Sequence, residues 1–123
     1  MNIFVVEDDV FAGAMLVDVL HLQQHHVELA SSVDLGFLAL MSTKISIDLL
    51  VLDAVIGTSS CEDLITRLRG GNHAIPPIVL LSGETPEFLH ALAARIGAIA
   101  ILHKPLRLQT LIGAIELIRQ PEA

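Results

Sequence analysis

Short apolar runs alternate with longer amphipathic stretches along the whole chain. The runs have the length of buried strands and occupy residues 3–6, 27–30, 49–52, 78–81 and 98–102. The stretches between and after them have helical length and occupy residues 10–24, 33–43, 61–70, 86–96 and 107–119. Strands that alternate with helices predict right-handed crossovers, and therefore a doubly wound parallel sheet of the α/β class.

The spacing of apolar residues inside the helical stretches predicts which side chains meet the core. The first helix carries an amphipathic stripe at helical spacing, formed by Phe11, Met15, Val19 and Leu22. We interpret Met15 as a core residue, and Met41 in the second helix likewise.

Composition narrows the class of protein. At 123 residues the chain has an ordinary length for one domain, so we expect a single domain over residues 1–123. Its residues are 53% hydrophobic and 3% aromatic, which is typical of a sheet covered on both faces.

The single Cys excludes an internal disulfide and a Cys-based zinc site. The apolar runs are too short for a membrane span and no basic leader is visible, so we expect a cytoplasmic protein.

Formal charge is unevenly distributed. The net charge is −7, and residues 1–61 hold eight acidic residues against one basic residue, Lys44. Binding to a nucleic acid requires a basic patch, and the sequence contains none. Three of the acids, Glu7, Asp8 and Asp9, follow directly on the first apolar run, where like charges disfavour one another unless a cation lies between them.

Polar residues follow the predicted strands at the points where ligands bind in open parallel sheets. The candidates at these strand ends are Glu7, Asp8 and Asp9, then Asp53, Ser82 and Lys104. Carboxylates that converge without a counter-ion repel one another by about 4 kcal/mol per pair at about 4 Å. Mg2+ suits such an oxygen site. Asp53 is the natural nucleophile for phosphoryl transfer, with Lys104 and Ser82 as charge-stabilising partners.

Together and in this order, these residues resemble the receiver domain of bacterial two-component response regulators of the chemotaxis-regulator type. The resemblance extends from Asn2 to about Arg119 and includes the motifs "GAIAILHKP" and "LLVLDAVIG". It implies a flavodoxin-like sheet of five parallel strands in the order 2-1-3-4-5, with five helices on both faces.

The resemblance also implies a role for each residue. Asp53 would be the phosphoacceptor, and Asp9 and Asp53 would bind Mg2+ directly, with the backbone carbonyl of Val55. Asp8 would act through a water molecule, and Glu7 would not be a principal ligand. The remaining roles fall to Lys104, which would pair with the phosphoryl group, and Ser82, which would swing inward to bind it.

Three positions depart from the family pattern. Ile101 stands where the family usually has Tyr or Phe, so the aromatic half of the activation switch is missing and Ser82 and Ile101 form the switch pair here. Gly57 replaces a common Pro, which predicts a looser loop over the site. Cys61 replaces a common Gly, and we interpret it as a half-buried filler rather than a nucleophile.

Other interpretations stay open for the individual residues and for the function. Asp8 and Asp9 also suit the N-cap and first turn of a helix. A haloacid dehalogenase-like phosphatase would carry a second Asp where this chain has Val55, and an FMN carrier would not place acids after the first strand. A receiver-like module that binds proteins without phosphorylation is the main alternative.

The resemblance implies protein partners rather than a substrate. We expect a sensor histidine kinase or histidine phosphotransfer protein as phosphodonor, and a downstream protein or a missing effector domain as target. No output domain is visible in the chain, and we expect no enzyme activity beyond its own phosphorylation and dephosphorylation. A homodimer or target contact is expected around Ile101, Arg95 and Arg107.

Overall fold

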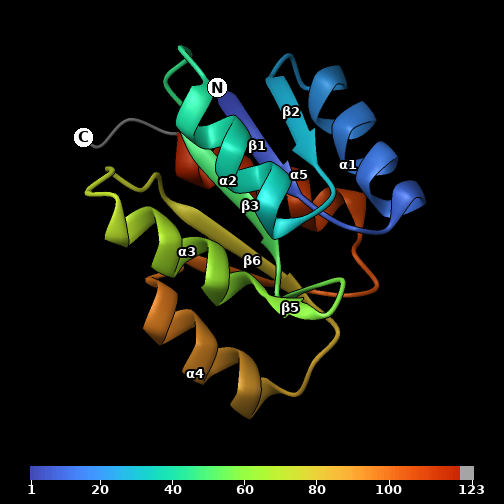
Figure 1. The fold of residues 1–123 in the computed structure, drawn as a ribbon. Helices are drawn as coiled ribbons and strands as arrows, with labels where there is room; N and C mark the ends of the chain where they lie inside the picture. The colour runs from blue at the N-terminus through green and yellow to red at the C-terminus, as the bar shows by residue number, and fades with distance from the viewer. Residues whose placement is uncertain (120–123) are drawn as a thin grey trace.

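The computed structural model describes residues 1–119, which form a five-stranded parallel sheet between two layers of helices (Figure 1). The strands lie in the order β2-β1-β3-β6-β7. Their bounds are β1 (Asn2–Val6), β2 (His26–Ala30), β3 (Leu49–Asp53), β6 (Ile78–Ser82) and β7 (Ala100–His103). The helices are α1 (Val10–Leu22), α2 (Val33–Ser42), α3 (Cys61–Gly70), α4 (Pro86–Ile96) and α5 (Leu108–Arg119).

This architecture confirms the predicted fold class. All four strand pairs of the sheet are parallel, and their order is the predicted 2-1-3-4-5 once the five strands are counted along the chain. Within residues 1–119, no helix has both the length and the apolar character that crossing a membrane requires.

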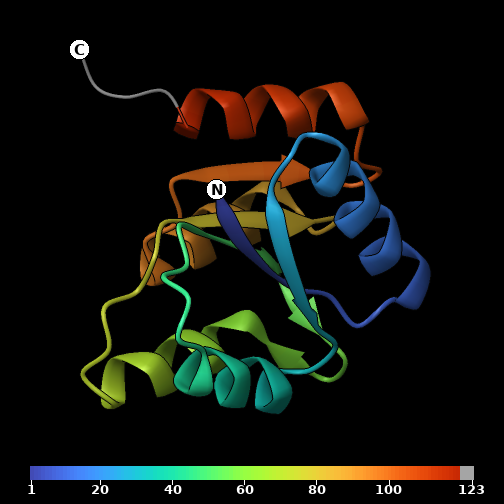
Figure 2. The same cartoon turned by 90° about the horizontal axis from the view of Figure 1, so that it is seen from above.

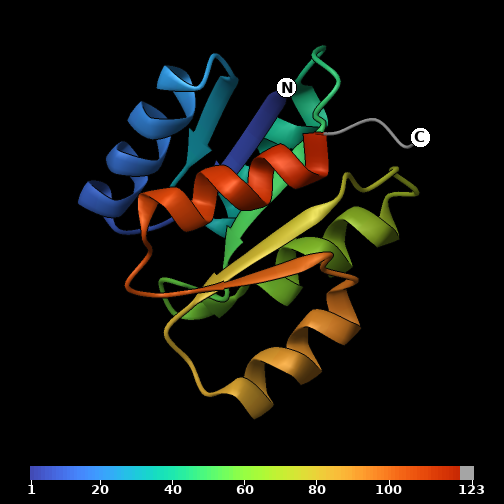
Figure 3. The ribbon, with the colours of Figure 1, turned by 180° about the vertical axis from the view of Figure 1, so that it is seen from behind.

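Each strand supplies side chains to both layers of the core because successive residues point to opposite faces. In β1, Ile3 and Val5 pack in the layer beneath α1 and α5. Phe4 and Val6 pack in the opposite layer, beneath α2, α3 and α4. Figures 2 and 3 show α1 and α5 together on one face of the sheet. The central strands are therefore buried on both faces, and this packing fixes the positions of the residues at the ends of these strands.

Helix α1 turns a different stripe toward the sheet than the spacing predicts. Phe11 is 86% exposed, and Met15 is 41% exposed, as is Met41 in α2. The interpretation of both methionines as core residues is therefore wrong. A Cβ atom at position 13 would lie 3.1 Å from the Leu29 side chain, so glycine lets α1 approach β2 closely. The residues of α1 that are buried are Gly13, Leu16 and Leu20.

A small hairpin follows β3 and was not expected from the sequence. Strands β4 (Val55–Ile56) and β5 (Ser59–Ser60) pair antiparallel, and Gly57 lies in the turn between them with φ of 63°. A positive φ strains residues that carry a Cβ atom. The glycine therefore supports a paired hairpin with a defined turn, in contrast to the looser loop that the sequence suggests.

Replacement of Gly57 tests this role of the turn. Gly57→Ala should lower the free energy of unfolding by about 1 kcal/mol, through backbone strain alone, because no atom lies within 4 Å of the added Cβ. Gly113→Ala is the matched control, since its Cβ also meets open space but the residue lies inside α5. That variant should gain about 0.5–1 kcal/mol. Urea unfolding measures the free energy of unfolding of both variants. Equal changes in the two would contradict the role of Gly57 as the residue that allows the turn.

Candidate functional site

The carboxyl ends of four strands bring polar side chains to one edge of the sheet. Glu7 and Asp8 follow β1, and Asp53 ends β3. Ser82 ends β6, and Lys104 follows β7. Because the strands are parallel, these residues meet although up to 97 positions separate them along the chain. Asp53, Ser82 and Lys104 thus lie at the edge where the sequence predicts the site.

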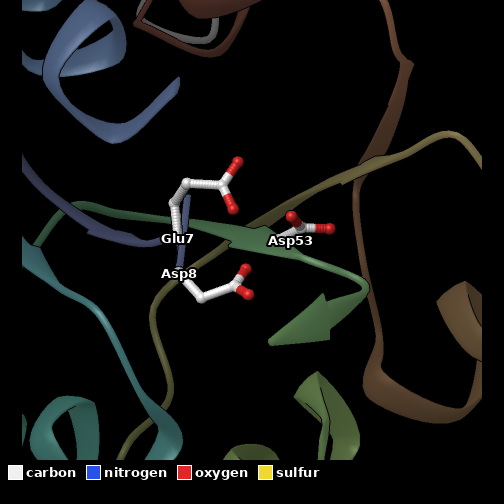
Figure 4. Close-up of side chains that lie close together, drawn as sticks. All are labelled: Glu7, Asp8 and Asp53. Atoms are coloured by element: carbon white, nitrogen blue, oxygen red, sulfur yellow. The ribbon is translucent and has the colours of Figure 1, made fainter. Parts of the chain in front are cut away.

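Three carboxylates form a cluster at this edge. One carboxylate oxygen from each of Glu7, Asp8 and Asp53 lies within 4.8 Å of the other two. Figure 4 shows the side chains of Glu7 and Asp8 extending from the end of β1 toward Asp53. Among residues 1–119, this is the one group of three or more His, Cys, Asp or Glu side chains close enough to hold a metal ion.

Lys104 partly balances the negative charge of the cluster. Its Nζ donates to Asp53 Oδ2 at 2.7 Å and to Glu7 Oε1 at 2.9 Å. Burial alone lowers the pKa of Lys104, but the hydrogen bonds to Asp53 and then Glu7 outweigh it and raise the pKa above its usual value. The ammonium therefore stays charged and connects the ends of β7, β3 and β1. One cation faces three acidic side chains, so the cluster keeps an excess of negative charge even where Glu7, whose pKa is about 7, carries a proton.

Glu7 is the most buried acid of the cluster. The residue is 2% exposed. Burial first, together with Asp53 and against an opposing effect of Lys104, raises the pKa of its carboxyl to about 7. Glu7, which the resemblance does not make a principal ligand, therefore lies inside the acidic cluster. The signal that could have identified it is its position directly after the last residue of β1, which places its side chain at the edge of the sheet.

Asp9 lies outside the cluster, which corrects its predicted place beside Asp53. Its side chain caps α1, where Oδ1 accepts a hydrogen bond from the backbone N–H of Ala12 at 2.8 Å. The first N–H groups of a helix lack intrahelical partners, and an Asp at the N-cap satisfies one of them. The backbone N–H of Asp9 also donates weakly to Glu7 Oε2, at 3.4 Å. Asp9 therefore fixes the start of α1, and Glu7 takes its expected place in the cluster.

Ser82 and Ile101 lie on neighbouring strands beside the cluster. Ser82 is buried, and its Oγ accepts a hydrogen bond from the backbone N–H of Glu84 at 2.9 Å. The hydroxyl proton remains available for donation. Ile101 is half-buried and packs against the core layer beneath α4. Val55 begins the hairpin, and its N–H lies 3.4 Å from Asp53 Oδ1.

Cys61 is fully buried beneath the same edge of the sheet, and not half-buried as the sequence suggests. Burial first, and then the nearby charge of Asp53, raise the pKa of its thiol to about 12. A thiol with so high a pKa supplies little thiolate at neutral pH, which agrees with its interpretation as a packing residue.

A mostly apolar cavity of about 300 Å³ opens beside the cluster, between the start of α1 and the chain after β7. Lys104, Glu7 and Asp9 form its polar wall. Next to it, Val10 and Phe11 are strongly exposed at the start of α1. The cavity's apolar lining consists of Ala12, Met15, Leu16, Leu81, Pro105 and Leu106.

Comparison with solved structures identifies the same fold in bacterial signalling proteins. The Vibrio cholerae chemotaxis protein CheY4 matches with a TM-score of 0.84 at 19% identity, over 95% of this chain and 97% of that chain. A two-component response regulator from Clostridium difficile matches with a TM-score of 0.84 at 22% identity, over 96% and 94% of the two chains. A response regulator receiver domain protein from Clostridium thermocellum matches with a TM-score of 0.80 at 24% identity, over 95% and 92%.

Sequence comparison leads to the same group of proteins. A search of curated proteins finds no match. The family model of the response regulator receiver domain matches residues 3–116, which is nearly the whole chain. The match agrees with the fold and with the acidic edge of the sheet, and it supports a phosphoacceptor role in two-component signalling. The chain therefore belongs to the response regulator receiver domain family.

Proposed function

We propose that Asp53 accepts a phosphoryl group from the phosphohistidine of a sensor histidine kinase or a histidine phosphotransfer protein. The observation that carries this proposal is the 2.7 Å contact between Lys104 Nζ and Asp53 Oδ2 inside the acidic cluster. The ammonium places a fixed positive charge beside the carboxylate that acts as the nucleophile. Asp53 is 8% exposed, so its carboxylate is screened from bulk solvent but lies at the open edge of the sheet.

The transfer forms one bond and breaks one. A carboxylate oxygen of Asp53 attacks phosphorus, the bond from phosphorus to the donor's imidazole nitrogen breaks, and the imidazole leaves with a proton from solvent. The product is an acyl phosphate on Asp53. Lys104 stabilises the charge on the transferred group, and the Ser82 hydroxyl donates to one of its oxygens. The chain thus catalyses its own phosphorylation and dephosphorylation, and we do not propose turnover of another substrate.

The donor set of the cluster fits Mg2+. Three carboxylate oxygens lie within 4.8 Å of one another, and the excess negative charge beside Lys104 favours a hard cation with oxygen ligands. We assign Asp8 and Asp53 as ligands together with the backbone carbonyl of Val55, and Glu7 as the buried acid next to them. When bound, Mg2+ neutralises charge that would otherwise repel the incoming phosphoryl group.

The surface beside Asp53 suits contact with a protein phosphodonor. A donor must bring its phosphohistidine to a carboxylate that is itself mostly buried. The apolar cavity next to Lys104 and the exposed side chains of Val10 and Phe11 offer it an anchoring surface. Apolar pockets of this kind are typical centres of protein interfaces.

Phosphorylation then changes contacts on the face formed by α4, β7 and α5. Ser82 exchanges its hydrogen bond with Glu84 for one to the phosphoryl group, and Ile101 packs behind it without an aromatic ring to rotate. Arg95 pairs with Glu62 across α4 and α3 at 2.9 Å, whereas Arg107 is exposed. This face contacts a downstream protein, an effector domain or a second copy of the chain.

Intact-protein mass after incubation with acetyl phosphate and Mg2+ tests the proposal. We expect a gain of one phosphoryl group that disappears in Asp53→Asn and when Mg2+ is omitted. Asp18→Asn is the control, because Asp18 is an exposed carboxylate of α1 away from the cluster.

Absence of a mass gain with acetyl phosphate in the wild-type chain, together with no binding of the phosphoryl mimic beryllofluoride in the presence of Mg2+, would contradict the proposal. The protein would then act as a receiver-like module that binds partners without phosphorylation.

Mg2+ affinity shows which of Asp8 and Asp9 is the ligand of the metal ion. Asp8→Asn should weaken binding by at least about tenfold, since loss of even an outer partner of a metal site costs that much. Asp9→Asn should change affinity by less than about threefold, because Asn also caps helices and the lost charge is screened by solvent. Isothermal titration calorimetry measures both variants. A larger loss in Asp9→Asn than in Asp8→Asn would restore Asp9 as the ligand.

A further inference from the structure

The opposite edge of the sheet contains a buried histidine in contact with the amino group of Met1. His25 ends the turn between α1 and β2 and is 4% exposed. Its backbone N–H donates to the carbonyl of Leu20 at 3.1 Å, and the next residue, His26, donates to the carbonyl of Met1 at 3.0 Å. Figures 1 and 3 show the N-terminus at this edge, away from the ends of the strands that carry the acidic cluster.

The contact defines the protonation state of the ring. The Met1 ammonium lies 3.0 Å from His25 Nδ1. An ammonium has donors and no acceptor, so Nδ1 must be the acceptor and must carry no proton. The ring is therefore the neutral tautomer with its proton on Nε2. That atom is buried and has no hydrogen-bond partner within residues 1–119.

The charged groups around His25 come from two elements. Met1 contributes its ammonium from the start of β1, and α5 contributes Arg119 and Glu116 near its end. Burial lowers the pKa of His25, the Met1 ammonium and then Arg119 lower it further, and Glu116 opposes them. The packing of the ring and the cations facing it act in the same direction, against the imidazolium form.

We propose that His25 and the Met1 ammonium form an acid-sensitive clasp that holds the start of β1 against the turn between α1 and β2. A proton on Nδ1 removes the lone pair that accepts the hydrogen bond. It also places a second positive charge 3.0 Å from the first one, in a buried site. The clasp then opens, and the start of β1 loses an anchor beside α5.

The sign of the pH dependence follows from the neutral ring in the folded state. Above about pH 6.5 the ring is neutral in both the folded and the unfolded chain, and the clasp contributes fully. As pH falls below about 6.5, the unfolded chain binds a proton that the folded chain resists, so stability is lost. The loss is complete once pH falls below the lowered pKa of the folded state.

Urea unfolding between pH 5 and 7.5 tests the clasp, on protein whose amino terminus is free and whose tag, if any, is at the other end. As pH falls through this range, the unfolding equilibrium constant of the wild type should rise more than that of His25→Gln, because only the wild-type chain gains a proton at this position on unfolding. His90→Gln, an exposed histidine of α4, is the control and should follow the wild type. Parallel curves for the wild type and His25→Gln would overturn the proposal.

An NMR titration gives a second test that does not depend on folding of the His25 variant. The Cε1 proton of His25 should titrate below pH 6.5 in the folded wild type. A Gly-Ser extension before Met1 replaces the ammonium by an amide, so the pKa of His25 should rise toward its ordinary value. A titration at or above pH 6.5 in the wild type, or no response to the extension, would contradict the clasp.

Discussion

One ammonium group holds the acidic edge of this protein together. Lys104 contacts Asp53 and Glu7 at the same time, and so connects the ends of three strands that are distant in sequence. Without this cation, the acidic side chains that lie within 4.8 Å of one another would repel more strongly, and the pKa of Glu7, already raised to about 7, would rise further. Lys104 does not neutralise the cluster completely, and the remaining negative charge is what makes the site fit a divalent cation and a phosphoryl group.

The parallel sheet makes this arrangement possible at little conformational cost. The ends of β1, β3, β6 and β7 are held in register by their backbone ladders, and the core on both sides consists of buried apolar side chains. Each strand needs to supply one or two polar residues at its end, and the topology brings them together. The side chains therefore need little ordering of their own, as expected of a preorganised site.

The sequence predicts those parts of the molecule that depend on strand ends and apolar periodicity. The five main strands and the positions of Asp53, Ser82 and Lys104 at their ends follow from the alternation of apolar runs, and the order of the strands follows from the family resemblance. Whether Glu7 or Asp9 joins Asp8 and Asp53 in the cluster does not follow from this alternation, because it depends on where β1 ends and α1 begins. A shift of one residue moves a side chain from the edge of the sheet to the cap of a helix.

Features that depend on close packing were harder to predict. The stripe of α1 that faces the sheet contains Gly13, which hydrophobic spacing ignores, and so Met15 was placed in the core although it is exposed. The hairpin after Asp53 depends on a positive φ at Gly57, and the sequence alone suggested only flexibility there. His25 is the clearest case, because its ring contacts the amino group of Met1, a contact that no periodicity describes. Local pattern thus identifies the elements and the strand-end chemistry, whereas contacts between distant backbone ends have to be read from the folded chain.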